Sequence, residues 1–245
     1  MKLPAQPNKS LMDGLACLQA LSLCTEPVGS RELARLLRLE PTRVNRLLGT
    51  LASMGLAEQD AQRKYRPGPG IHALAAQSLF GSGLVNRAVR YLPPLHKYGH
   101  VVALGVLWRD QTSYLYQVNP QSPADRGIVQ GFPFPAASSG IGLVLLAQQP
   151  EESVRELYEP TEPPLLPLNF DPPDLDALFR RLAQVREEGH ALVTTDLGRR
   201  TLAVPVGDTA YAGVGFAGKF RNDDVPGLKA ALTDAAANID RTEVP

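Results

Sequence analysis

The sequence is poor in cysteine, which argues against both disulfide bonds and a cysteine-ligated metal site. Its 245 residues contain two cysteines, Cys17 and Cys24. Their separation is too long for a disulfide within one helix and matches no metal-ligand spacing. We therefore expect reduced thiols, with core packing as their role, and no metal site.

Long hydrophobic runs are also missing. No stretch approaches the roughly 20 apolar residues of a membrane-spanning helix. The first ten residues hold two lysines with no apolar segment behind them, so they do not resemble a signal peptide. Hydrophobic residues nevertheless make up 44% of the chain, which suffices for a folded core. We expect a cytoplasmic protein of one large domain or two unequal ones, with no membrane association.

The sequence lacks the motifs of the common enzyme classes. Its four histidines show no HxxxH or HExxH spacing, and no GxSxG elbow or phosphate-binding glycine loop occurs. Residues 213–218, GVGFAG, superficially suggest a dinucleotide fingerprint, but they lie inside an expected strand rather than after one. We therefore expect no catalytic residues and no cofactor, and a small-molecule enzyme is the least favoured alternative.

The net charge is zero, but it is unevenly distributed. Residues 1–70 carry ten Lys or Arg and six Asp or Glu, whereas residues 71–245 carry fifteen and nineteen. A small basic part followed by a larger acidic part favours a nucleic-acid-binding head on a separate body.

Residues 30–55, SRELARLLRLEPTRVNRLLGTLASMG, predict two helices joined by a short turn. Ser30 is expected to cap the first helix, which runs to Arg38, because its hydroxyl can accept a bond from a free backbone N–H. Pro41 suits the first position of the second helix, and Gly55 suits its end. A helix over residues 11–23 precedes the pair, with one side formed by Leu11, Leu15, Leu18 and Leu21.

The second helix of the pair has a polar face without acidic residues. That face carries Thr42, Arg43, Asn45, Arg46, Gly49 and Thr50. Arginine can bind guanine bidentately, asparagine can bind adenine, and threonine can contact a thymine methyl group or a phosphate. The face therefore suits the DNA major groove, although an ordinary helical hairpin with a solvated face would look the same.

A hairpin is expected after the helical pair, over residues 56–66. Arg63, Lys64 and Arg66 on its return strand suit phosphate contacts, which add affinity without sequence choice. The sequence PGPG at residues 67–70 predicts a boundary. A short helix over residues 71–80 follows, with an apolar side that needs a partner such as a second copy of the chain.

Residues 84–245 predict an α+β body with a largely antiparallel sheet. The expected strands lie at residues 101–108, 113–118, 128–132, 191–195, 201–206 and 211–217. The expected helices are residues 84–98, interrupted by Pro93-Pro94, then 138–148, a helix capped by Asp174, and 225–239. Between them, residues 159–174 are rich in proline and predict a long loop.

The order of these parts resembles the IclR family of bacterial transcription regulators over almost the whole chain. The similarity rests on ELARLL and VNRLLGTL in the helical pair, KYRPGPGIHAL after the hairpin, SSGIG before LVLLAQ, VREEGHAL and TLAVPV. None of these segments is specific alone, but their order and spacing together are.

The resemblance implies an α+β protein with three parts. These are a winged helix-turn-helix head at residues 1–66, a linker helix at 67–83, and a GAF-like effector-binding and oligomerisation domain at 84–245. It also implies a homodimer or tetramer that acts as a repressor or activator at a palindromic double-stranded operator. The DNA-binding residues would then be Ser30, Arg31, Thr42, Arg43, Asn45, Arg46, Arg63 and Lys64.

The resemblance further implies a small organic effector, such as a carboxylate or an aromatic acid. Its candidate contacts are Phe132, Ser138, Ser139, Gly140, Ile141, Thr194, Thr195, Asp196, Gly215 and Ala217. The backbone N–H groups of Ser139, Gly140 and Ile141 would be free to bind an anion. Simpler interpretations are a helix cap at Ser138 and Ser139, a plain turn at 194–196, and core packing for Phe132.

The sequence departs from the family pattern at several positions. Arg38 stands where the family usually has glycine between the two helices. Ala137 and Leu143 replace a histidine and a lysine, while a family aspartate falls near Val193. Glycine and alanine replace two serines on the last strand. The pocket is thus less polar than usual, and a dimeric DNA-binding regulator with a non-functional effector pocket is an alternative.

Overall fold

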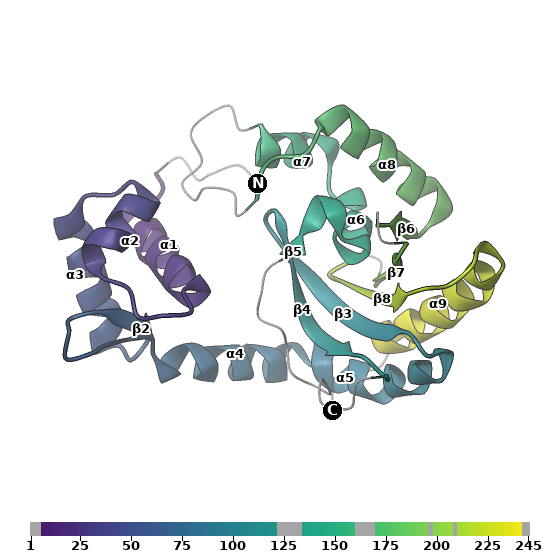
Figure 1. Ribbon diagram of the computed structural model, residues 1–245, viewed down its shortest axis with the longest axis horizontal. Helices are drawn as coiled ribbons and strands as arrows, with labels where there is room; N and C mark the ends of the chain where they lie inside the picture. Colours follow the sequence, from purple (N-terminus) through teal and green to yellow (C-terminus); the bar gives the residue numbers. More distant parts are fainter. Residues whose placement is uncertain (1–5, 122–133, 160–169, 196–197, 208–209, 242–245) are drawn as a thin grey trace. The chain divides into compact units, whose positions relative to one another are not determined.

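The computed structural model describes residues 6–121, 134–159, 170–195, 198–207 and 210–241, and these divide into two compact units (Figure 1). The first unit contains the described residues up to Gly81, and the second contains those from Ser82 onward. Helices and an antiparallel sheet occur together in the chain, which makes it an α+β protein.

The first unit contains three helices and a two-stranded hairpin. The helices are α1 (Lys9–Leu23), α2 (Ser30–Leu37) and α3 (Pro41–Ser53), followed by β1 (Ala57–Gln59) and β2 (Tyr65–Pro67). The two strands pair antiparallel. Their shared core is formed by Cys17, Leu21, Val28, Leu33, Ala34, Val44, Leu48, Ala57 and Tyr65. The predicted helical pair and hairpin are confirmed, and together they form a winged helix-turn-helix.

The buried side of α1 differs from the predicted leucine stripe. Leu11 and Leu15 are 61% and 53% exposed, whereas the buried residues are Ala16, Cys17, Ala20 and Leu21. Small side chains let α1 approach α3 closely: a Cβ on Gly14 would lie 3.8 Å from Cδ2 of Leu47. Cys17 is buried and reduced, as expected from the sequence.

The two ends of α2 differ from a regular capped helix in different ways. Ser30 is not the N-cap: Gly29 is, and Ser30 is the first helical residue. Just before this cap, Val28 and Tyr65 exchange two backbone hydrogen bonds of 2.8 Å, and α2 begins directly after Gly29, one residue earlier than predicted. At the other end, Arg38, which stands where the family usually has glycine, adopts a left-handed conformation with φ 54° and ψ 39°.

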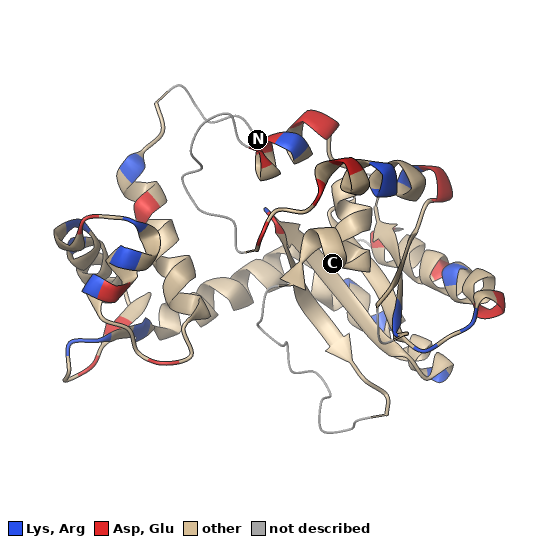
Figure 2. Cartoon of the chain, turned by 45° about the horizontal axis from the view of Figure 1, so that its top comes forward, with Lys and Arg blue, Asp and Glu red and all other residues tan. Residues whose placement is uncertain are grey.

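Helix α4 (Pro69–Ser82) begins earlier than the predicted helix over residues 71–80. Its first residue is a proline, whose missing N–H is not needed there. None of its residues is buried, and none is Lys, Arg, Asp or Glu (Figure 2). Leu74 and Phe80 are 55% and 76% exposed.

The second unit is built on a six-stranded sheet in the order β5-β4-β3-β8-β7-β6, with every neighbouring pair antiparallel. The strands are β3 (Val101–Trp108), β4 (Gln111–Val118), β5 (Phe134–Pro135), β6 (Ala191–Thr194), β7 (Arg200–Val206) and β8 (Ala212–Gly218). The predicted hairpin and the last three strands are confirmed. The strand predicted at 128–132 lies outside the described residues.

Helices cover both faces of this sheet (Figure 1). One face packs against α5 (Leu84–Tyr91), the 3-10 helix η1 (Pro93–Tyr98) and α9 (Val225–Arg241), which follows η4 (Asn222–Asp224). The other packs against η3 (Ala136–Ser138), α6 (Gly140–Ala147), α7 (Glu151–Tyr158) and α8 (Leu175–Glu188). Asp174 caps α8 as predicted, by accepting from the amide of Ala177. Helix α7 was not predicted.

A β-bulge in β4 assigns two tyrosines to opposite faces. Leu104 is paired with Tyr116, but the next residue, Gly105, is paired with Tyr114. Tyr116 therefore packs with the α5 and α9 core, and Tyr114 packs with the α6 core. Without the bulge, residues two apart would share one face.

Candidate functional site

An exposed polar stripe runs along α3. Thr42, Asn45, Arg46, Gly49 and Thr50 are all exposed, while Val44 and Leu48 on the opposite side are fully buried. Buried residues at this spacing fix α3 in one rotation against α1 and α2. The stripe holds a cation, an amide and two hydroxyl groups, and no carboxylate. Its groups can therefore donate to base edges and phosphates without repelling either.

Arg43 differs from the rest of the predicted set. Its Nε lies 2.6 Å from Oδ2 of Asp13 on α1, and the two side chains are 33% and 13% exposed. The guanidinium is directed towards α1, at the flank of the stripe. The same carboxylate, after the larger effect of burial, helps to raise the pKa of Cys17 to about 11.

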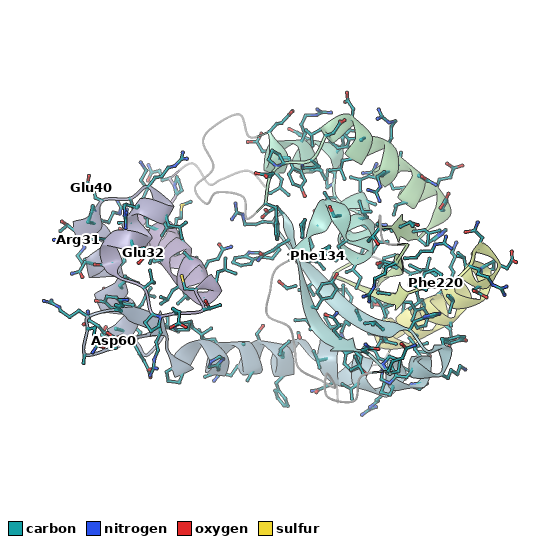
Figure 3. The ribbon with its side chains drawn as sticks, in the orientation of Figure 1. Arg31, Glu32, Glu40, Asp60, Phe134 and Phe220 are labelled. Carbon is teal, nitrogen blue, oxygen red and sulfur yellow. The ribbon has the colours of Figure 1, made fainter. Side chains whose placement is uncertain are left out.

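The remaining candidates of the first unit lie on α2 and on the hairpin. Ser30 is half-buried in the first turn of α2, and Arg31 next to it is exposed and points outward (Figure 3). Arg63 and Lys64 are exposed at the hairpin tip. Asp60 shapes that tip, because its carboxylate accepts from the amides of Gln62 and Lys64 at 3.0 and 2.8 Å.

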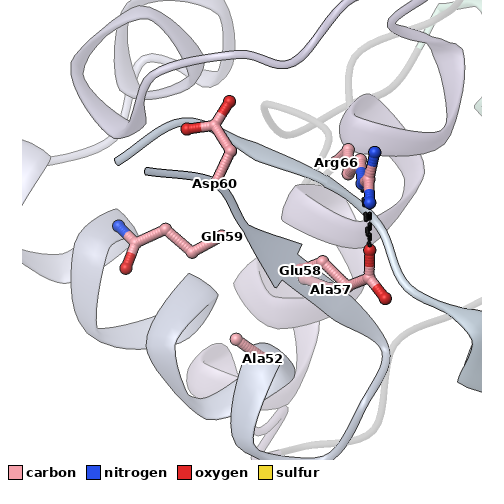
Figure 4. A pocket seen from close by; sticks show the side chains of 6 residues that line it. All are labelled: Ala52, Ala57, Glu58, Gln59, Asp60 and Arg66. Carbon is pink, nitrogen blue, oxygen red and sulfur yellow. Dashed lines mark hydrogen bonds and ion pairs between the residues drawn. The ribbon is translucent and has the colours of Figure 1, made fainter. Parts of the chain in front are cut away.

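A hollow of about 360 Å³ lies between the end of α3 and the hairpin (Figure 4). It is lined by Ala52, Ala57, Glu58, Gln59, Asp60 and Arg66. Arg66 is paired with Glu58 at 2.8 Å, so its charge is already matched within the hairpin. The two acidic residues make the hollow unfavourable for a phosphate, and Arg63 and Lys64 are left as the wing cations that form no ion pair within the described residues.

In the second unit, the start of α6 lies directly on the sheet. A Cβ on Gly140 would come within 2.8 Å of Cγ2 of Thr201 on β7, and a Cβ on Gly213 within 2.9 Å of Cγ2 of Ile141. Gly215 pairs with Ala203 and Ala103 on its two sides, and Ala217 pairs with Thr201. The structure thus brings together the candidates Gly140, Ile141, Gly215 and Ala217 on one sheet face lined by small residues.

Ser139 caps α6, while Ser138 does not. The Ser139 hydroxyl accepts from the amide of Gly142 at 3.1 Å and shares a hydrogen bond of 3.1 Å with the Tyr114 hydroxyl. Burial raises the pKa of Tyr114, and the bond to Ser139 opposes that shift. Ser138 is exposed in η3.

The expected set of free amides is partly wrong. The Ser139 N–H donates to the carbonyl of Pro135 at 3.1 Å, because η3 immediately precedes the helix and supplies an acceptor. Among the described residues, no hydrogen bond involves the amides of Gly140 and Ile141. These two donors lie at the positive end of the helix dipole, which favours an anion or a carbonyl oxygen.

The effector-binding candidates Thr194 and Thr195 belong to a turn. Thr194 and Thr195 are exposed at the end of β6, and Thr195 donates from both its amide and its hydroxyl to the carbonyl of Arg199, at 2.8 and 3.1 Å. These bonds close the connection to β7. Asp196, like Phe132, lies outside the described residues.

Two polar residues on the α6 side of β4 were not among the candidates. Tyr114 reaches Ser139 and packs edge-on against Phe134, with ring centroids 6.5 Å apart. Thr112 is fully buried beside Gly105, and its hydroxyl has no hydrogen-bond partner in the described structure. The alternating pattern of β4 marked it as a strand, but the bulge that directs Tyr114 towards α6 has no signature in the sequence.

The described residues show neither a metal-binding cluster nor a membrane-spanning helix. Over the described ranges, no three His, Cys, Asp or Glu side chains come together in a way that could hold a metal ion. In the same part of the chain, no helix has the length and apolar character needed to cross a membrane.

Comparisons with known families match both units. The "IclR helix-turn-helix domain" matches residues 10–61, and the "Bacterial transcriptional regulator IclR C-terminal" domain matches residues 77–241. Among characterised relatives, the HTH-type transcriptional regulator BhcR of Paracoccus denitrificans is 32% identical over 195 residues, covering 76% of this chain and 69% of BhcR. The regulator KdgR of Dickeya chrysanthemi is 28% identical, covering 97% of this chain and 81% of KdgR.

Solved structures share the fold. An IclR family regulator from Brucella abortus superimposes with a TM-score of 0.79 at 23% identity, covering 100% of this chain and 95% of that one. An IclR homologue from Microbacterium hydrocarbonoxydans, complexed with 4-hydroxybenzoate, gives a TM-score of 0.67 at 19% identity, covering 94% and 97%. With a helix-turn-helix DNA-binding domain and a C-terminal effector domain, the chain belongs to the IclR family of bacterial transcription regulators.

Proposed function

We propose that this regulator binds a double-stranded operator through α3 and that a small organic acid bound in the second unit alters that binding. The observation that carries the first half is the exposed, acid-free stripe of α3 opposite a fully buried face. Residues 1–66 would form the DNA-binding domain, 67–83 the linker, and 84–245 the effector-binding and oligomerisation domain.

The exposed residues divide into base-reading and phosphate-binding groups. Asn45 and Arg46, in the middle of the stripe, suit hydrogen bonds to base edges. Arg43 remains a candidate base reader at the flank. Phosphates would be held by Ser30, Arg31, Thr42, Arg63 and Lys64, which position the protein without reading sequence.

Dimerisation is proposed from α4. Its uncharged surface exposes Leu74 and Phe80. Apolar surface of this kind favours association with a second copy, because burial removes it from water. A dimer would present two copies of α3 and so favour a palindromic operator, with a dimer or tetramer as the assembled state.

The DNA-binding proposal is tested by substituting Arg46. Arg46→Ala should lower affinity for DNA from the promoter beside the protein's own gene by about 1–3 kcal/mol and relax selectivity at one base position. Gel-shift titrations with specific and scrambled duplexes measure both quantities. Arg180→Ala, which removes an exposed arginine of α8 in the second unit, is the matched control. Equal binding by the Arg46 variant and wild type would contradict the proposal.

The effector is proposed to be a carboxylate on a small, largely apolar body, with aromatic acids as the first candidates. The free amides of Gly140 and Ile141 suit the carboxylate, and the small residues beside them on the sheet face suit contact with an apolar body. Tyr114 and Phe134 add aromatic surface at its edge. The relative that binds 4-hydroxybenzoate supports an aromatic acid as a starting ligand.

A thermal-shift screen with 4-hydroxybenzoate and other organic acids tests the proposed effector binding. A ligand at 100 times its Kd should stabilise the folded state by about 2.7 kcal/mol and raise the melting temperature. Ala217→Val, which enlarges a half-buried residue of the sheet face, should weaken the response. If no acid shifts the melting temperature or the DNA affinity, the alternative of a dimeric regulator with a non-functional pocket is favoured.

Enzymatic activity is not part of the proposal, because the characterised relatives are transcription regulators. Chemical turnover of any screened acid, followed by chromatography, would contradict this.

A further inference from the structure

The ion pair between α1 and α3 joins a largely buried carboxylate to the helix that carries the polar stripe. Nε of Arg43 is buried and lies 2.6 Å from Oδ2 of Asp13, an ion pair without hydrogen-bond geometry, and a third of the Arg43 side chain remains exposed. The exposed part therefore lies elsewhere on the side chain. A guanidinium has five N–H donors, and only one belongs to Nε. Its terminal amino groups can still meet another acceptor.

The position of Arg43 makes a counter-charge necessary. Arg43 lies in the first turn of α3, where the helix dipole is positive and disfavours a cation. Asp13 supplies the opposite charge from the neighbouring helix. The influence of Asp13 on the pKa of Cys17, one turn further along α1, agrees with a carboxylate held close against the core.

The pair is too buried to act as a simple on-off contact. With Arg43 in place the Asp13 side chain is 13% exposed, and if Arg43 left it to reach DNA, this largely buried carboxylate would lose its opposite charge, which is unfavourable. Arg43 must therefore meet DNA while still attached to Asp13. Its terminal amino groups then have a fixed direction.

We propose that Asp13 is a positioning residue that holds Arg43 through this ion pair, so that the terminal amino groups of Arg43 select one base position of the operator. The proposal rests on the proposed DNA-binding function and adds to it a residue on a helix outside the recognition helix. Because the pair is neutral, it should contribute to base choice rather than to salt-dependent affinity, which follows net cationic contacts.

The test uses full-length wild type, Asp13→Asn, Asp13→Glu, Arg43→Lys and Arg46→Ala. Each protein selects sequences from a randomised duplex pool, and the selected duplex is then titrated at several salt concentrations. Asp13→Asn should lose about tenfold discrimination at one base position, because Arg43 is no longer oriented. Its salt dependence should steepen by about one phosphate contact, because the arginine charge is no longer matched. Arg43→Lys should lose discrimination at the same position, and Asp13→Glu should recover part of it.

Glu32→Gln is the matched control. It removes one negative charge from an exposed site on α2, remote from any contact with Arg43, and should leave the base preference unchanged. If Asp13→Asn melts below the assay temperature, Arg43→Lys and Asp13→Glu carry the test, since both retain the opposite charges. If the folded Asp13 and Arg43 variants keep the wild-type base preference while Arg46→Ala loses it, the positioning role is overturned but the DNA-binding function is not. Unchanged preference in all of them, or absence of binding by wild type, overturns the proposed function as well.

Discussion

Helices α3 and α6 are the candidate sites of the two units, and they use opposite surfaces. Helix α3 is buried on one side and presents a polar stripe on the other. Helix α6 is buried at every one of its eight residues, and its useful groups are backbone amides at its first turn. The first site consists of side chains that project away from the fold, whereas the second consists of backbone pressed against a sheet.

This difference predicts different responses to substitution. Substitutions at a side-chain site should leave the free energy of unfolding almost unchanged and reduce only binding selectivity, because exposed side chains contribute little to the core. A backbone site should respond to added volume with loss of folding, because close-packed interiors have no room to adjust. Four substitutions test this contrast, from the largest expected effect to the smallest.

Gly142→Ala should have the largest effect. A Cβ at this position would collide with the carbonyl oxygen and Cα of Ala136, which are backbone atoms and cannot move aside. We expect the free energy of unfolding of the second unit to fall by about 3 kcal/mol, measured by urea denaturation. Gly227→Ala on α9, where a Cβ meets nothing within 4 Å, is the control and should be neutral or stabilising. Equal stability of the two variants would contradict the proposed difference between the backbone site on α6 and the side-chain site on α3.

Ser139→Ala should destabilise the same unit by about 1 kcal/mol, because the amide of Gly142 loses its capping acceptor and the Tyr114 hydroxyl loses a partner. The Tyr114 pKa should rise further, since the bond to Ser139 lowers it at present. Chemical denaturation and ultraviolet titration of tyrosine measure the two effects. Ser138→Ala, at the exposed neighbouring serine, should change neither, and a similar loss there would show that the cap is misassigned.

Arg38→Gly should stabilise the first unit by about 0.5–1 kcal/mol, because glycine adopts positive φ at no steric cost and arginine does not. The same change removes an exposed cation beside α3. Thermal unfolding should therefore improve while the salt dependence of DNA binding weakens slightly. A fall in melting temperature would show that the arginine side chain stabilises the turn.

Lys64→Ala should have the smallest effect, a uniform loss of DNA affinity with a salt slope lower by about one contact and an unchanged base preference. Arg66→Ala is the matched control, because its charge is already paired with Glu58. Equal losses in the two variants would contradict the separation of free and paired cations on the wing.

The sequence predicted the helix-turn-helix well because its signals are local. Pro41 begins α3, Gly55 has a positive φ after its end, and the spacing of buried Val44 and Leu48 fixes its rotation. The error at Ser30 arose from a contact distant in sequence. The bridge between Val28 and Tyr65 ends the extended segment next to Gly29, and α2 begins one residue earlier than the capping pattern suggests.

In the second unit the order of elements was predictable, but the site was only partly so. The strands and α8 carry strong alternation and capping signals, whereas α7 was missed. The face on which Tyr114 lies depends on a one-residue bulge that only pairing with β3 defines. The Ser139 amide is bonded because η3 precedes α6, which the sequence SSGIG does not reveal.

The sequence by itself determined the family, the α+β class and the polar stripe of α3. These depend on residue order and on backbone preferences that act over a few positions. Only the tertiary structure decided that Asp13 binds Arg43, that Glu58 pairs with Arg66, and that glycines let α6 rest on the sheet. Those contacts join segments distant along the chain, and their energies depend on distance and burial, which exist only after folding.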